Sequence, residues 1–329
     1  MSVELVAPGI WVVPTVVPNN PIGFTQAYLL ESTDGPYLVD TGWNADEAWT
    51  DLVDGLAACG TSVSEVAGVI VTHHHPDHLG LVGRVRDASG CWVGMHDADT
   101  ALVTRHRAIL DDDPEVFAKD TADKLREAGA SACDISEVNA ASALMNMPKP
   151  ELPDRSLSGG VLALGGRRVE LVHTPGHTPG HLCLRIDGRL LTGDHLLKTI
   201  SSHVGLYGFE GTTGDPLSDF FASLRLLTGD EPVEVLPAHR ARFTGVDARV
   251  EQLLAHHQER LADIKDVLSA GPLTPWELCH AMTWNKPWDE LPRMMLRAAL
   301  AETMAHVRLL ELQGVAVVEP GTPARVRLA

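Results

Sequence analysis

Cysteines are few in this chain, and they are scattered. The five thiols form no Cys-x-x-Cys pair, and such an odd, unclustered set indicates reduced cysteines in a cytosolic protein. The chain opens with no basic-then-apolar leader, and no apolar run approaches the roughly 18 to 20 residues of a membrane span. We therefore expect a soluble, cytoplasmic protein without a membrane partner. The cysteines are Cys59, Cys91, Cys133, Cys183 and Cys279.

Basic residues are also in short supply. The 329 residues include 26 Lys and Arg against 44 Asp and Glu, which gives a formal net charge of -18. This balance disfavours a protein whose main task is to grip a phosphate backbone, although a local basic channel is compatible with it. Hydrophobic residues make up 44% of the chain, enough for one large domain and a small one.

One short stretch, by contrast, is rich in histidine: Thr72-His73-His74-His75-Pro76-Asp77-His78. It follows an apolar run, residues 66–71, that predicts a buried β-strand. His73 and His75 share a face in extended backbone, while His74 points the other way. The loop can thus offer two imidazoles to one metal ion, and a carboxylate with an imidazole to a second. This donor set suits Zn²⁺, and also iron or manganese.

The stretch resembles the His-x-His-x-Asp-His signature of the metallo-β-lactamase superfamily, whose further motifs follow in order. Residues 173–181 resemble its Thr-Pro-Gly-His-x-x-Gly-His stretch, residues 193–194 its Gly-Asp, and residues 237–239 its Pro-Gly-His, with alanine for glycine. The resemblance covers about residues 1–248 and implies two divalent metal ions, above all Zn²⁺. It assigns His73, His75 and His177 to one ion, Asp77, His78 and His239 to the other, and Asp194 to a position between them.

Four further residues are expected to support or border these ligands. By the resemblance, Asp40 supports the metal-binding loop, although its Asp-Thr-Gly sequence also makes an ordinary turn. His195 and Lys198 are expected to border the site. Arg240 would place a cation there, for an acidic group of the substrate or for a local carboxylate. The histidines expected to be structural or supporting, and not ligands, are His96, His173 and His181.

The pattern along the chain predicts an α+β protein, and the resemblance implies a four-layer αββα sandwich for residues 1–248. Strands are expected at residues 10–13, 25–30 and 37–40, helices at 45–58 and 79–88, and hairpins at Gly165-Gly166 and Asp187-Gly188. Residues 100–158 look like a helical insertion, either a lid over the site or ordinary helix packing. In a lid, Leu144, Met145 and Met147 would contact an apolar substrate.

The end of the chain, residues 249–329, follows helical spacing and closes with an expected hairpin, which resembles a winged-helix domain. A winged helix suggests DNA. Residues 270–329, however, hold six basic and six acidic side chains, and this neutral balance is poor for binding a duplex. We expect instead packing beside the site, shaping of the pocket or a homodimer contact.

The implied chemistry is hydrolysis by a metal-bridging hydroxide, with Asp77 as the catalytic residue that orients it and takes up its proton. The chain has no Gly-x-Ser-x-Gly nucleophile sequence, and this chemistry requires none. The favoured substrate is an ester or thioester, of the acyl-CoA, acyl-carrier or glutathione type. An endoribonuclease or phosphodiesterase acting on RNA is disfavoured by the net charge. Lactone or β-lactam opening, and a non-catalytic binding protein on the same fold, are the remaining alternatives.

Overall fold

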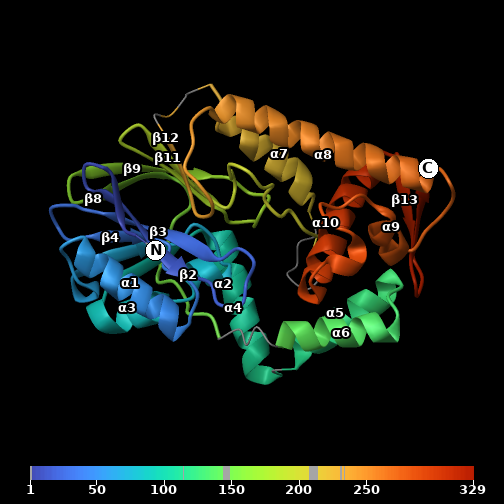
Figure 1. Ribbon diagram of the computed structural model, residues 1–329, viewed down its shortest axis with the longest axis horizontal. Coiled ribbons are helices and arrows are strands. Elements are labelled where there is room, and N and C mark those ends of the chain that lie inside the picture. Colours follow the sequence, from blue (N-terminus) through green and yellow to red (C-terminus); the bar gives the residue numbers. More distant parts are fainter. Residues whose placement is uncertain (1, 114, 144–148, 207–213, 230–231, 233) are drawn as a thin grey trace. The chain divides into compact units, whose positions relative to one another are not determined.

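Two β-sheets stack on each other in the first of two compact units of the chain (Figure 1). The computed structural model describes residues 2–113, 115–143, 149–206, 214–229, 232 and 234–329. The first unit comprises residues 1–108, 148–202 and 223–249, and the second comprises residues 109–147, 203–222 and 250–329.

The larger sheet has seven strands in the described part of the chain, and their order in space is their order in sequence. Strands β1 to β4 are antiparallel, whereas β4 to β7 run parallel. They are β1 (Glu4–Ala7), β2 (Ile10–Val16), β3 (Phe24–Leu30), β4 (Tyr37–Val39), β5 (Gly68–Ile70), β6 (Trp92–Met95) and β7 (Arg155–Ser156). The smaller sheet has the described strand order β12-β11-β10-β9-β8. Its strands are β8 (Gly160–Leu164), β9 (Arg167–His173), β10 (Leu182–Ile186), β11 (Arg189–Gly193) and β12 (Glu234–Pro237).

Alternation along the strands divides the apolar side chains between two cores. In β2, Ile10 and Val12 point into the core between the sheets, where Leu171 and Leu184 of the smaller sheet meet them. Val13 points to the opposite face and joins the core under the helices. This period of two is the one that a β-strand imposes on successive side chains. Each such side chain contributes about 1.5–3 kcal/mol when fully buried. The stability of the stacked strands therefore comes from these two cores and does not depend on the loops at the strand ends.

Helices cover the outer face of the larger sheet, where α1 (Asp46–Ala58) and α3 (Val82–Ser89) bury their apolar sides. At the smaller sheet, the guanidinium of Arg185 in β10 donates to the Leu226 carbonyl at the end of α7 (Pro216–Leu226), at 3.3 Å. These helices and sheets match the expected order of layers. The other helical elements here are the 3-10 helix Val63–Glu65, α2 (Pro76–Leu79) and the start of α4 (Asp97–Asp112).

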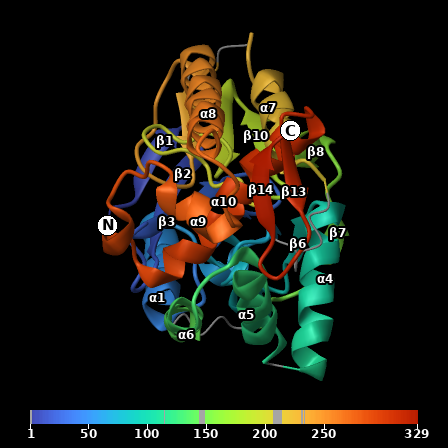
Figure 2. The ribbon, with the colours of Figure 1, turned by 90° about the vertical axis from the view of Figure 1, so that its right-hand side faces the viewer.

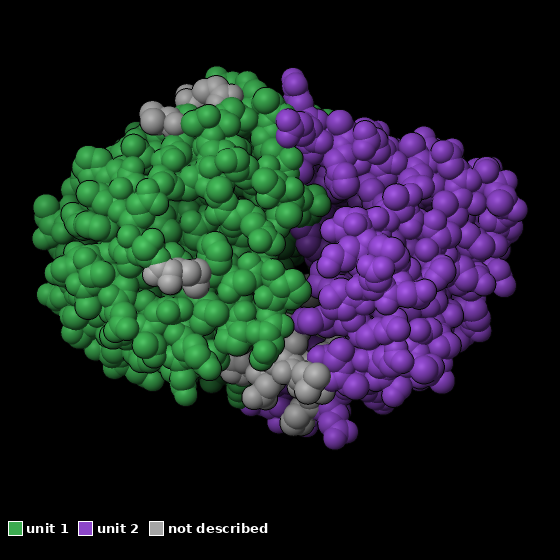
Figure 3. Space-filling model, viewed as in Figure 1, with its two compact units in different colours: residues 1–108, 148–202, 223–249 green, residues 109–147, 203–222, 250–329 purple. Residues whose placement is uncertain are grey.

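The second unit consists of helices and a small hairpin, seen from its side in Figure 2 and in purple in Figure 3. Leu125, Trp276 and Leu296 share one core, so the helices of the insertion pack on those of the tail. Thr274 caps α9, and its hydroxyl accepts from the Glu277 N–H at 3.1 Å. The elements are α5 (Val116–Ala128), α6 (Ala132–Ala143), α8 (Val246–Leu268), α9 (Pro275–Ala281), the 3-10 helix Trp288–Glu290, α10 (Arg293–Leu312), β13 (Ala316–Glu319) and β14 (Arg325–Leu328).

The predicted strands and hairpins are confirmed, and one predicted helix is confirmed only in part. The helix expected at residues 79–88 is broken, because α2 ends at Leu79 and α3 begins at Val82. Gly80 lies at the break, where an added Cβ would be 2.3 Å from the Pro76 carbonyl oxygen. The tail has the expected helices and hairpin, and its winged-helix identity stays a prediction. No helix among the described residues is both long enough and apolar enough to span a membrane. The expected apolar contacts Leu144, Met145 and Met147 lie outside the described residues.

Candidate metal centre

The polar residues singled out in the sequence come from loops that follow strands. The histidine-rich stretch follows β5, the loop of residues 174–181 joins β9 to β10, and Asp194 and His239 follow β11 and β12. All of these loops belong to the first unit, so the larger and the smaller sheet both contribute to one site.

Three imidazoles converge in the first group. His177 Nε2 lies 3.2 Å from His73 Nε2 and 3.0 Å from His75 Nδ1, and these two nitrogens are 3.0 Å apart. Zn–N bonds of about 2.0–2.1 Å in tetrahedral geometry separate two nitrogens by roughly 3.3 Å, so the triangle has nearly the size that a zinc ion requires.

A second group lies beside the first, and Asp194 faces both. His239 Nε2 is 3.2 Å from Asp77 Oδ2, and His78 Nε2 is 3.5 Å from the same oxygen. Asp194 Oδ1 is 3.2 Å from His239 Nε2, while its Oδ2 is 3.7 Å from His177 Nε2. The seven residues can therefore surround two cations, with the Asp194 carboxylate between them.

The outer nitrogens of these rings are held by hydrogen bonds that leave lone pairs pointing inward. Asp40 Oδ2 accepts from His78 Nδ1 at 2.8 Å and from the Thr72 hydroxyl at 2.8 Å. Since that hydroxyl donates to Asp40, it accepts from His73 Nδ1, 3.0 Å away, which leaves His73 Nε2 with a lone pair. His239 Nδ1 donates to the Phe24 carbonyl at 2.9 Å. Partners of this kind fix the ring orientation of metal-binding histidines.

The site also has the electrostatics of a cation site. Burial lowers the pKa of His73 and His75 well below the usual value, and the neighbouring histidines lower it further, so both rings are neutral. Burial would do the same to His78, but the carboxylates of Asp77, Asp40 and Asp194 raise its pKa well above the usual value. A metal ion would take the place of the proton that these carboxylates attract.

One orphaned atom supports this fit. His78 Nε2 is buried and has no hydrogen-bond partner among the described residues, although two carboxylate oxygens lie within 3.6 Å of it. Leaving a buried polar atom unpaired is costly in an ordinary core. A divalent cation would satisfy it together with the carboxylates.

The residues expected at the border of the site differ in where they lie. Asp40 is buried behind His78, with a φ of 60° that places its carboxylate under the loop. His195 is buried, with its ring centroid 5.5 Å from that of His181. Lys198 and Arg240 have exposed side chains, and no contact described in the structure joins either of them to the seven converging residues. His96 stacks on His173, with centroids 3.9 Å apart.

Two further residues support the converging side chains, and of these only His181 was expected from the sequence. His181 accepts the backbone N–H of Asp194 at Nε2, 3.2 Å away, and its Nδ1 contacts the Thr174 hydroxyl at 2.9 Å. Asp99, in the first turn of α4, accepts hydrogen bonds from the His74 backbone N–H and from the Thr178 hydroxyl. The motif containing His181 was visible in the sequence, whereas nothing local distinguished Asp99.

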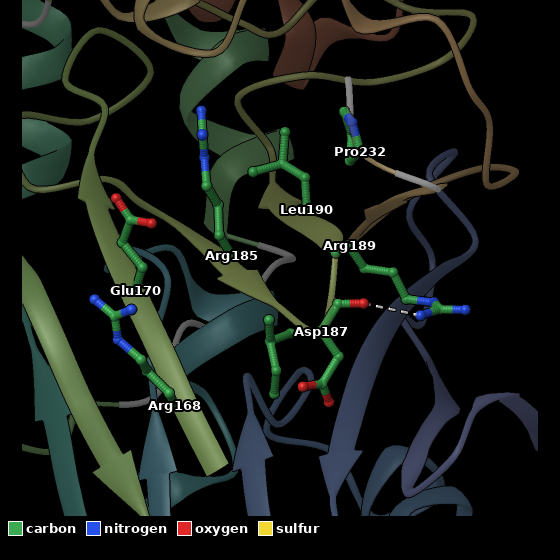
Figure 4. A pocket seen from close by; sticks show the side chains of 9 residues that line it. Arg168, Glu170, Arg185, Asp187, Arg189, Leu190 and Pro232 are labelled. Carbon is green, nitrogen blue, oxygen red and sulfur yellow. Dashed lines mark hydrogen bonds between the residues drawn. The ribbon is translucent and has the colours of Figure 1, made fainter. Parts of the chain in front are cut away.

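A separate depression on the first unit has a volume of about 270 Å³ and contains none of the residues expected at the site (Figure 4). It lies on β9, β10 and the turn that follows, where Arg189 donates to the Asp187 carbonyl at 3.1 Å. The convergence of donor atoms, and not the size of a hollow, therefore locates the candidate centre. Arg168, Glu170, Arg185, Ile186, Asp187, Gly188, Arg189, Leu190 and Pro232 line the depression.

Known proteins share this architecture. Residues 20–239 match the model of the metallo-beta-lactamase superfamily. The chain is 29% identical to the probable metallo-hydrolase YqjP of Bacillus subtilis over 308 residues. The alignment covers 89% of each protein. A metallo-beta-lactamase family protein of Thermus thermophilus is 30% identical, with a TM-score of 0.82 over 99% of this chain and 100% of its own. A beta-lactamase domain protein from Burkholderia ambifaria is 26% identical, with a TM-score of 0.85 over 99% of this chain and 94% of its own. Both structures thus extend well past the residues that the family model matches.

Proposed function

The chain belongs to the metallo-beta-lactamase superfamily and is a hydrolase, and from this premise we propose that it cleaves an ester or thioester with the help of two zinc ions. His73, His75 and His177 would hold one ion. Asp77, His78 and His239 would hold the other, and Asp194 faces both groups. Iron or manganese could bind the same nitrogen and oxygen donors.

Bound divalent cations would lower the pKa of a water towards neutrality and stabilise the negative charge that develops on the substrate. The chain positions the groups around that water. Thr25 donates its hydroxyl to Asp77 Oδ2 at 3.0 Å, which orients this carboxylate. We assign to Asp77 the uptake of the proton that the attacking water releases. Arg240, exposed and next to His239, would bind an acidic group of the substrate.

The observation that carries the substrate class is the charge of the chain. A phosphodiester backbone is bound through many phosphate contacts to Lys and Arg, and this chain has 18 more acidic than basic residues. An ester or thioester needs no such extended surface, because its reacting carbonyl is neutral and even coenzyme A carries far fewer phosphates than a nucleic-acid backbone. Acyl-CoA, acyl-carrier and glutathione-type thioesters are therefore the substrates that we propose.

The test is thiol release from a panel of acyl-CoA and acyl-glutathione thioesters by the metal-loaded protein. We expect metal-dependent release, and none by the Asp194→Ala variant, which lacks the shared carboxylate. Single-stranded RNA and a chromogenic phosphodiester are assayed in parallel with the same preparations. Turnover of these two without thiol release would reject the thioester proposal and leave the metal-dependent hydrolase in place.

A further inference from the structure

The two loops that carry the three converging histidines are joined by one buried carboxylate, that of Asp99. Its side chain is fully buried. Asp99 Oδ2 accepts from the His74 backbone N–H at 2.9 Å, from the Thr178 hydroxyl at 2.8 Å and lies 3.1 Å from His74 Nδ1. Asp99 Oδ1 accepts from the Gly180 N–H at 2.6 Å. All four partners can donate, which suits an ionised carboxylate.

The partners of Asp99 are the sequence neighbours of the histidines. His74 stands between His73 and His75, and Thr178 follows His177 directly. Asp99 therefore binds each loop at a residue that directly adjoins one of the converging histidines in the sequence. A shift of either loop by a few tenths of an ångström would change the 3.0–3.2 Å separations between those nitrogens.

The second glycine of the Thr-Pro-Gly-His-Thr-Pro-Gly-His sequence is explained by the same carboxylate. An added Cβ at Gly180 would lie 2.6 Å from the Asp99 backbone nitrogen and 2.7 Å from Asp99 Oδ1. Only glycine allows the loop to approach so closely. The loop and Asp99 thus fit each other over both side chain and backbone.

The surroundings keep Asp99 ionised. Its place in the first turn of α4 sets the carboxylate against the positive end of the helix dipole. Burial alone would raise the pKa of Asp99, but the His74 side chain and the hydrogen bonds from His74 and Thr178 hold it below the usual value.

We infer that Asp99 is a positioning residue that holds the loops of His73, His75 and His177 at the spacing one metal ion requires. The inference rests on the metal centre proposed above and goes beyond its ligands. Asp99 has no described contact with Asp77, His78 or His239, and so its influence is confined to the three-histidine group. Asp40 differs from Asp99 in this respect, because it contacts His78 of the other group directly and reaches His73 through the Thr72 hydroxyl.

The experiment is a titration of metal-free protein with Zn²⁺ in competition with a chromophoric chelator, which gives the affinity of each site. His177→Ala identifies the three-histidine site by abolishing it. In Asp99→Asn we expect the affinity of that same site to fall about 10- to 100-fold, as is typical when a partner behind a ligand is lost, with the other site unchanged. Asp40→Asn is expected to weaken both sites, because Asp40 contacts His78 directly and His73 through Thr72. Asp97→Asn, an exposed aspartate in the same helical turn, is the matched control and should bind as wild type does.

Two results would overturn the inference: wild-type affinities at both sites of Asp99→Asn, or an equal loss at both sites, which would indicate general destabilisation. If Asp99→Asn does not fold, Thr178→Val removes a single donor, and a smaller loss at the same site is expected; unchanged affinity there would count against the inference. A wild-type chain that binds no Zn²⁺ would reject the metal centre itself. Because no substrate is involved, an error about esters and thioesters leaves the outcome unaffected.

Discussion

Two buried clusters of histidine in the described part of the chain are built in different ways. In the first unit, nitrogens of His73, His75 and His177 point at one another within 3.2 Å. In the second unit, His257 and His306 form a chain: His306 Nδ1 donates to the Glu302 carbonyl at 2.8 Å, and its Nε2 lies 3.0 Å from His257 Nδ1.

The difference lies in whether ring tautomers can satisfy the contacts. In the hydrogen-bonded pair of His257 and His306, each ring donates through Nδ1, and His306 Nε2 accepts from His257. Two neutral rings therefore satisfy these contacts without any ion. Three nitrogens in a triangle cannot all be paired in this way, because each edge requires one donor and one acceptor. Buried histidines therefore occur both in structural clusters and in metal-binding clusters. Only a metal-binding cluster brings several nitrogen lone pairs together with carboxylates beside them.

Replacing one histidine in each cluster should separate their roles. His75→Ala removes a proposed ligand, and we expect thioester turnover to fall at least about 100- to 1000-fold, a loss comparable to that of one essential transition-state contact. His257→Gln should keep wild-type turnover. Circular dichroism and thermal unfolding would check that both variants fold. Full activity of His75→Ala would contradict the assignment of two metal ions.

Removal of metal should loosen only one of the two clusters. We expect chelation to abolish turnover reversibly and to cost the first unit about 4 kcal/mol if the free metal had stood at 1,000 times its Kd. Hydrogen exchange, read peptide by peptide, is the measurement. Amides of residues 72–78 and 174–181 should lose protection, while those of α8 and α10 should keep theirs. Equal loss of protection in both units would mean that the metal stabilises the chain globally.

The first cluster could be foreseen because its signals are local. The spacing of His73 and His75 on a strand end places them on one face, and His74 on the other, as the structure has them. The strands were readable for a similar reason, since burial on a sheet imposes a period of two on neighbouring residues.

Features that depend on distant contacts could not be foreseen. Asp99 lies 25 residues from His74 and 79 from Thr178, and a single aspartate in a helical turn has no pattern of its own. That the insertion and the tail share a core is equally hidden, because both are amphipathic helices and pairing of faces is a tertiary property.

The titration of His257, which is hydrogen-bonded to His306, should affect the pH dependence of the free energy of unfolding. Burial, followed by the His306 ring, lowers the pKa of His257 from 6.5 to about 3. Between these pH values the unfolded chain holds a proton that the folded chain lacks. The free energy of unfolding therefore falls as the pH falls, by at most about 1.4 kcal/mol per pH unit for this group. Denaturant unfolding from pH 7.5 to 4.5 would measure it.

His257→Gln removes this titration and keeps an amide donor for His306. The stability of wild type relative to this variant should therefore drop by about 2–3 kcal/mol as the pH falls from 6.5 to 4.5. His256→Gln, its partly exposed neighbour in α8, is the matched control and should follow wild type. A pH-independent difference would mean that the folded chain accepts the proton, which the unpaired and buried Nε2 of His257 should prevent within the described structure. The comparison of the two clusters would then fail for the pair of His257 and His306, because a charged ring would be tolerated there without a metal and with only the Glu302 carboxylate to favour it.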